Sequence, residues 1–211
     1  MTKTTKAIKN SSSQRFSEQL GGWVSSKQPK TLDTLIANFG EKSFAVIILL
    51  FMLLPALPIP TGGITHVFEA VVVVIAAEQV IGLKAIWLPD FLSRRIKLER
   101  LVKGKTMEAM LKRITWLESK SSPRGKLVFK APLFSRIIGL IIIALTVAAF
   151  LAPPFSGLDT LPALGIVLIC LSLLLEDAVL LAVGLVIGAA GALISIFLGA
   201  AAVHFFKGLF H

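Results

Sequence analysis

Four acidic side chains interrupt the apolar runs of this chain: Glu69, Glu78, Glu176 and Asp177. An ionisable group inside a membrane segment costs at least ~2.5 kcal/mol on insertion scales and marks a functional site by default. A glutamate so placed can hold and release a proton or coordinate a cation. Alternatively, each acid lies at the membrane–water interface and only ends a helix. This alternative suits the adjacent pair Glu176 and Asp177, because two neighbouring acids are costly to bury. Glu69 can complement the N-terminus of its helix. We therefore take Glu78, Glu176 and Asp177 as the candidate intramembrane acids.

Proline and glycine break the chain inside both apolar blocks. Between residues 43 and 68 there is no formal charge, yet this stretch holds the first break. A solvated loop with so many breakers would be polar, and non-helical backbone at membrane depth is tolerated only within protein or beside a water-filled cavity. We predict that the breaks belong to the functional centre. Their residues are Pro55, Pro58, Pro60, Gly62 and Gly63 in the first block, and Pro153 and Pro154 in the second.

The apolar runs on either side of the first break are short. Phe44–Leu54 and Ile64–Ala77 have 11 and 14 residues, whereas a helix needs about 20 to cross the hydrocarbon core. Either the chain crosses twice with an apolar outer turn, or two half-helices meet in a re-entrant hairpin. We favour the hairpin, because short segments interrupted by proline and glycine are typical of broken-helix sites.

A weak internal repeat relates the two blocks. A shift of 98 residues places Pro55 on Pro153 and Glu78 on Glu176 without a gap. Repeats with breaks in corresponding positions are typical of transporters. The alternative is chance, since any two apolar blocks align.

The composition predicts an all-α, polytopic integral membrane protein. Of the 211 residues, 55% are hydrophobic and 16% charged, against roughly 25% charged in soluble domains. Four segments follow: a basic tail with amphipathic helices (1–42), a first hydrophobic repeat (43–83), a basic amphipathic segment (84–136), and a second repeat with a final transmembrane helix (137–211). The amphipathic segments either lie on the membrane surface or pack on the membrane domain.

The basic residues indicate an orientation and a partner. Residues 84–136 hold 14 Lys and Arg against 4 Asp and Glu, which predicts a cytoplasmic segment near anionic headgroups and parallel, not inverted, repeats. We expect no nucleic-acid binding despite the net charge of +10, because no reading motif accompanies it. The glycines Gly184, Gly188 and Gly191 of the last run allow close helix packing, and we expect a homodimer.

No enzyme, cofactor or metal site is expected. The sequence has no phosphate loop, no nucleophile elbow and no metal-ligand spacing. His204 and His211 are seven apart without a supporting carboxylate. His66, beside the first break, is interpreted as a bystander.

One group of motifs resembles a known family. Leu54-Pro55-Ala56-Leu57-Pro58-Ile59-Pro60 with Gly62-Gly63, then Gln79-Val80-Ile81-Gly82 and Trp87-Leu88-Pro89, is similar to the ExoD family of bacterial exopolysaccharide-synthesis membrane proteins. The resemblance covers residues 15 to 205 and implies a bacterial inner-membrane protein linked to exopolysaccharide production. It carries over no catalytic residue.

Two functions from different classes remain open. The protein is either a small oligomeric ion or solute transporter, or a non-transporting accessory subunit that scaffolds exopolysaccharide machinery. The first needs intramembrane acids that water can reach, and the second needs a stable partner complex.

The orientation can be tested by labelling. In a Cys170→Ser background, a cysteine introduced at Ser121 should react with an impermeant reagent only from the cytoplasmic side. Labelling from the periplasm alone would contradict the predicted orientation, and equal labelling from both sides would point to dual topology.

Overall fold

A computed structural model describes residues 15–57, 64–83, 86–87, 98–102, 104–122, 129, 131–152 and 157–209. Within these ranges the regular structure is entirely helical, in agreement with the predicted all-α class. The chain divides into two units, Met1–Gly40 with Pro89–Ser122, and Glu41–Leu88 with Pro123–His211. The predictions for Pro58, Pro60, Gly62, Gly63, Pro153 and Pro154 concern residues outside the described ranges.

The first unit is a small amphipathic cluster. It contains α2 (Phe16–Ser25), α3 (Leu32–Phe39), α7 (Leu98–Val102) and α8 (Lys105–Lys120). The Glu118 carboxylate of α8 accepts the Phe16 and Ser17 N–H groups at 2.7 and 3.4 Å, and also the Ser17 hydroxyl. These are N–H groups that the first turn of α2 cannot satisfy itself. A carboxylate far along the chain therefore caps α2 and joins it to α8.

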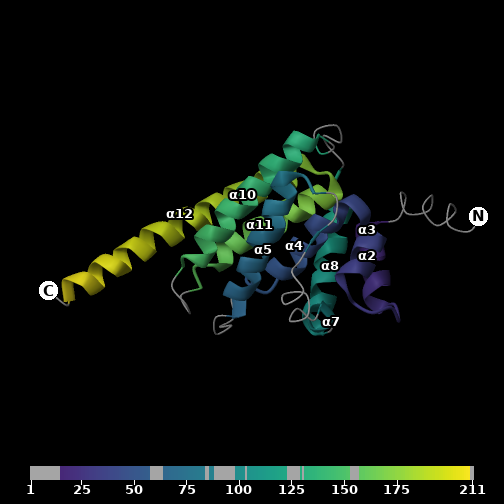
Figure 1. Ribbon diagram of the computed structural model, residues 1–211, viewed down its shortest axis with the longest axis horizontal. Helices are drawn as coiled ribbons and strands as arrows, with labels where there is room; N and C mark the ends of the chain where they lie inside the picture. Colours follow the sequence, from purple (N-terminus) through teal and green to yellow (C-terminus); the bar gives the residue numbers. More distant parts are fainter. Residues whose placement is uncertain are drawn as a thin grey trace, which may run out of the picture. The chain divides into compact units, whose positions relative to one another are not determined.

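The second unit is built around α4 (Ser43–Met52). No residue of α4 is more than 8% exposed. The helix is apolar all round, so it must be enclosed by other helices. It contacts α5 (Ile64–Ile81) and α11 (Thr160–Leu175), while α5 packs most extensively on α10 (Pro132–Phe150). Figure 1 shows these four helices side by side.

Packing overrides local preference in α5. Four consecutive valines, Val71–Val74, lie in its middle, and β-branched residues are poor helix formers because they lose χ1 freedom. Val71 and Val72 are almost completely buried. The helix therefore depends on its neighbours for its stability rather than on its own propensity.

Glycines bring α11 and α12 (Ala178–Leu209) into close contact. A Cβ on Gly165 would lie 2.3 Å from the Gly188 Cα, and one on Gly191 would lie 2.6 Å from the Pro162 backbone nitrogen. A Cβ on Gly184 would likewise lie 2.9 Å from the Ile169 backbone nitrogen. The small-residue face of α12 is thus covered by α11 of the same chain. The far end of α12 extends beyond the other helices of this unit (Figure 1).

Three stretches are long and apolar enough to cross a membrane: Leu32–Met52, Pro132–Phe150 and Ala178–Leu198. This is consistent with a membrane protein. The first stretch is not a single regular helix, because α3 ends at Gly40 with φ 55° and a 3-10 turn, Gly40–Lys42, precedes α4. The positive φ at this junction favours glycine.

The contact between Gly165 and Gly188 can be tested by adding one methyl group. Gly165→Ala should lower the free energy of unfolding by about 1–3 kcal/mol, because overpacking against backbone forces the two helices apart. Thermal unfolding in detergent, followed by circular dichroism, measures the effect. Gly22→Ala is the matched control, since nothing lies within 4 Å of a Cβ there. Equal melting temperatures for the two variants would contradict the close approach.

Candidate functional site

Helix α5 carries two buried carboxylates. Glu69 is 0% exposed and Glu78 is 6% exposed. They are nine residues apart, so at 3.6 residues per turn they lie on opposite edges of the buried face of α5. Each has one oxygen, Oε1, without a hydrogen-bond partner in the described part of the chain. Such atoms are costly to bury, so each needs an explanation.

The Glu78 cluster lies where α5 ends and consists of Glu78, Gln79, Gly82, Trp87 and Ser135. Glu78 Oε2 accepts the Trp87 backbone N–H at 2.9 Å, which ties the segment after α5 back to the helix. Gln79 Nε2 donates to the Ser135 backbone oxygen at 3.1 Å and to its hydroxyl at 3.2 Å. Gln79 Oε1, like Glu78 Oε1, is buried and has no partner among the described residues.

Two glycines make this cluster possible. Gly82 ends α5 with φ 86°, and a Cβ there would lie 3.1 Å from the Arg136 guanidinium. Gly139 allows α10 to approach α5, because a Cβ there would lie 2.8 Å from Val80 Cγ2 and 3.1 Å from the Ala76 oxygen. Gln79, Val80 and Gly82, which belong to the motif that resembles the family, therefore lie against α10.

The structure places Glu176 and Asp177 at the junction of α11 and α12. Glu176 has φ 56°, a left-handed conformation that ends α11, and its carboxylate pairs with Lys42 at 3.5 Å. Lys42 also donates to the Leu174 backbone oxygen at 3.0 Å. Asp177 Oδ1 accepts the Val179 N–H at 2.9 Å, as an N-cap residue does. Both acids have roles in helix ends, and their part in function stays a prediction.

The segments that enter and leave the two breaks lie at one end of this unit. The Phe51 and Phe68 rings are 5.6 Å apart, which brings the end of α4 to the start of α5. The His66 and Phe150 rings are 5.1 Å apart, which brings the start of α5 to the end of α10. Pro55, the described residue of the first break, is buried just after α4. Glu78 and Glu176 belong to the opposite ends of their helices.

Sequence reasoning missed the pair of His66 and Glu69. His66 Nδ1 lies 2.8 Å from Glu69 Oε2, one turn along α5. The spacing of three residues places both side chains on one helix face and was visible in the sequence, but the complete burial of Glu69 was not. Asp159 is close enough to interact electrostatically with Glu69. In the described part of the chain, no three His, Cys, Asp or Glu side chains gather as a metal site would require.

The hydrogen bond from Trp87 can be tested by amide exchange. Glu78→Leu should speed exchange of the Trp87 backbone N–H about tenfold or more, because a hydrogen bond to a charged acceptor contributes about 1.5–3 kcal/mol. Glu78→Gln, which keeps an acceptor oxygen, should have a smaller effect. Glu108→Leu, on an exposed position of α8, should have none. Unchanged exchange in Glu78→Leu would contradict the contact.

Comparisons with known proteins find similarity over most of the chain. The model of the family described as exopolysaccharide synthesis, ExoD, matches residues 16–197. Protein ExoD of Rhizobium meliloti is 29% identical over 84% of this chain and 75% of its own length. An uncharacterized protein of Synechocystis sp., slr1875, is 27% identical over 74% of this chain and 72% of its own length. No solved structure matches the chain significantly. The family match extends over most of the chain and includes both helical units, so this protein belongs to the ExoD family of exopolysaccharide-synthesis proteins.

Proposed function

We propose that the protein is a multi-pass protein of the bacterial inner membrane that moves an ion or small solute in support of exopolysaccharide synthesis. The single observation that carries this proposal is the pair of buried carboxylates in α5, each with an oxygen that lacks a partner among the described residues. Such groups inside a membrane bundle are the usual means of holding a proton or cation on its way across.

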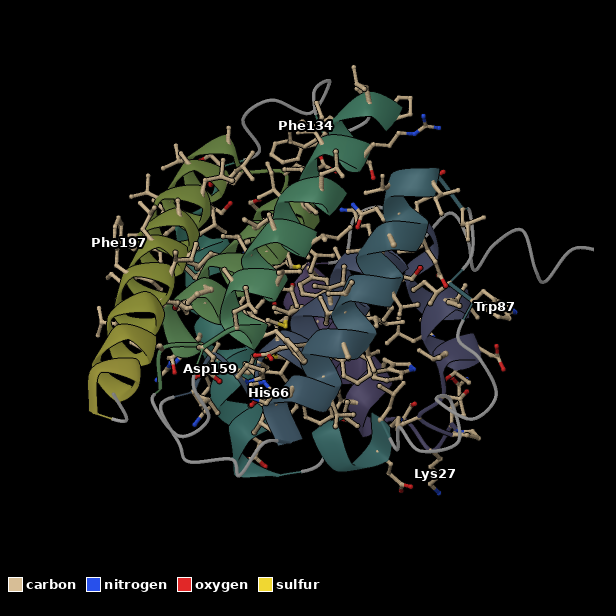
Figure 2. All side chains as sticks on the ribbon, turned by 60° about the vertical axis from the view of Figure 1, so that its left-hand side comes forward. Lys27, His66, Trp87, Phe134, Asp159 and Phe197 are labelled. Atoms are coloured by element: carbon tan, nitrogen blue, oxygen red, sulfur yellow. The ribbon has the colours of Figure 1, made fainter. Side chains whose placement is uncertain are left out.

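The outer faces of α10 and α12 support the membrane location. Large apolar side chains recur there every three, four or seven residues and are 42–70% exposed; they are Leu133, Ile137, Leu140 and Val147 on α10, and Val179, Val183, Val186, Leu193 and Phe197 on α12. Figure 2 shows Phe197 on the outer side of its helix. Soluble monomers rarely expose apolar patches of more than a few hundred Å², whereas a bilayer would cover these faces.

The arrangement around α4 supports broken-helix repeats. The ten residues of α4 make a helix about 15 Å long, which is half the thickness of a hydrocarbon core of about 30 Å. The first helix of each block packs against the second helix of the other, α4 against α11 and α10 against α5. Two hairpins related by a local twofold axis would pack in this way. We propose that α4 and α5 form one re-entrant hairpin and that α10 and α11 form the second repeat, in which α10 is long enough to cross the membrane.

Transport through so small a bundle calls for more than one copy, and we propose a homodimer. The glycine face of α12 is covered by α11, so a second copy would use another surface. The exposed apolar faces of α10 and α12 are the surfaces of this unit that suit it. Anionic headgroups would accompany the basic segments on the cytoplasmic side.

A flux assay tests the transport proposal. In proteoliposomes that enclose a pH-sensitive dye, wild-type protein should carry protons down an imposed gradient. Glu69→Gln and Glu78→Gln, which remove the two buried carboxylates of α5, should each slow this flux about tenfold and impair complementation of a deletion strain, while membrane insertion stays intact. Glu108→Gln is the matched control.

The two outcomes separate the candidate functions. Wild-type complementation by both single variants and by the double variant would remove these acids from the mechanism. Complementation by the wild type without any measurable flux would contradict transport and favour the accessory subunit of an exopolysaccharide complex.

A further inference from the structure

His66, near the start of α5, contacts Glu69, which is one of the two buried carboxylates on which the proposed transport function rests; that function gives His66 no role. His66 Nδ1 and Glu69 Oε2 are 2.8 Å apart. The His66 side chain is 26% exposed, whereas the Glu69 side chain is completely buried. The imidazole therefore reaches the surface of the described part of the protein, while the carboxylate lies wholly inside it.

Among the residues that the structure describes, the surroundings of Glu69 offer no counter-charge other than His66. His66 is the one basic side chain of the described residues that pairs with Glu69, and it is cationic only when protonated, while Asp159 opposes a negative charge on Glu69. Figure 2 shows His66 and Asp159 near one another. The packed neighbours at this end of α5 are the aromatic residues Phe51 and Phe150 from α4 and α10. The helix N-terminus cannot compensate Glu69 either, because its effect falls off within the first turn and Glu69 is the sixth residue of α5.

This geometry requires a proton. An ionised carboxylate without a counter-charge costs several kcal/mol to bury. Removing the partner of a buried ion pair leaves such an uncompensated charge. Either His66 is protonated and forms an ion pair with Glu69, or the Glu69 carboxyl is protonated beside a neutral imidazole. In both arrangements one exchangeable proton is held between Nδ1 and Oε2.

We propose that His66 and Glu69 form a proton-binding relay near the start of α5, beside the end of α10. His66 takes the proton from water and Glu69 holds it inside. The second Glu69 oxygen, Oε1, is buried and has no partner among the described residues. It is therefore free to accept a hydrogen bond from a proton donor deeper in the protein, such as a water molecule or a hydroxyl group.

Proton uptake starts from the proton-free pair, in which the Glu69 carboxylate is ionised and the imidazole is neutral with its hydrogen on Nδ1; this is the costly state that uptake relieves. Nε2 accepts a proton from a hydronium ion, which leaves as water, and the Nδ1 proton passes to Glu69 Oε2. The ring is then neutral again with its hydrogen on Nε2, and the carboxylate has become a carboxylic acid. The reverse sequence returns the proton to water. Net uptake is one proton, with no other reactant.

Proton binding at this site is independent of whether the protein transports anything. If the relay exists and no flux is measured, transport fails and the relay stands. If flux is measured and the relay fails, the proton takes another route. The test below therefore reads protonation directly in the full chain and does not use flux.

Infrared difference spectroscopy of the purified protein in lipid nanodiscs reads this protonation. Between acidic and neutral samples, wild-type protein should show a carbonyl band from a buried protonated carboxyl group together with imidazole bands. Glu69→Gln should lose the carbonyl band. Glu78→Gln, which removes another buried carboxyl group of the same helix, should keep it.

His66→Gln provides the second arm, because the partly exposed imidazole can be replaced with little effect on packing. The carbonyl band should persist in this variant but titrate around a different pH, since the partner that shares the proton is gone. A band that is unchanged in Glu69→Gln would overturn the proposal. An identical titration in wild type and His66→Gln would overturn the relay as well.

Discussion

The enclosure of α4 is the constraint on which the second unit depends. Its ten residues carry one polar side chain, Ser43, and none is more than 8% exposed. Within a bilayer, the lipid tails are as apolar as a leucine side chain, so moving an apolar side chain from lipid into the protein gains little free energy. Close packing and internal hydrogen bonds must then hold the helices together. The surrounding helices are accordingly in tight contact. Gly139 lets α10 approach α5, and Gly165 meets Gly188 between α11 and α12.

Enclosing an apolar helix also determines where polar groups can lie. α4 offers no charged side chain to the carboxylates of α5. Their hydrogen-bond partners lie instead near the two ends of α5. Glu69 pairs with His66 near the start of the helix, and Glu78 accepts the Trp87 N–H after its end. Each keeps one oxygen without a partner among the described residues. Two carboxylates on the buried face of α5, each with one oxygen that lacks a partner among the described residues, are what the proposed movement of a proton or cation would use.

Some of this organisation could be predicted from the sequence and some could not. Apolar runs cut by proline and glycine predicted helices, and the motif after Ala77 pointed to the family. Small residues on α12 predicted close helix packing, but they did not indicate which helix packs there. In the structure it is α11 of the same chain rather than a second copy. The role of Glu69 was missed for a similar reason. A histidine three residues before a glutamate is common on solvated helices, and only tertiary packing makes Glu69 completely buried.

The most direct test of this account is a double-mutant cycle on His66 and Glu69. The free energy of unfolding in detergent would be measured for wild type, His66→Leu, Glu69→Leu and the double variant. Paired groups in a buried site couple by about 0.5–3 kcal/mol, whereas independent sites add to within about 0.5 kcal/mol. The account predicts a coupling of about 2 kcal/mol, with the double variant more stable than the sum of the single effects implies. Additive effects would show that the two side chains do not share a proton and would contradict the account.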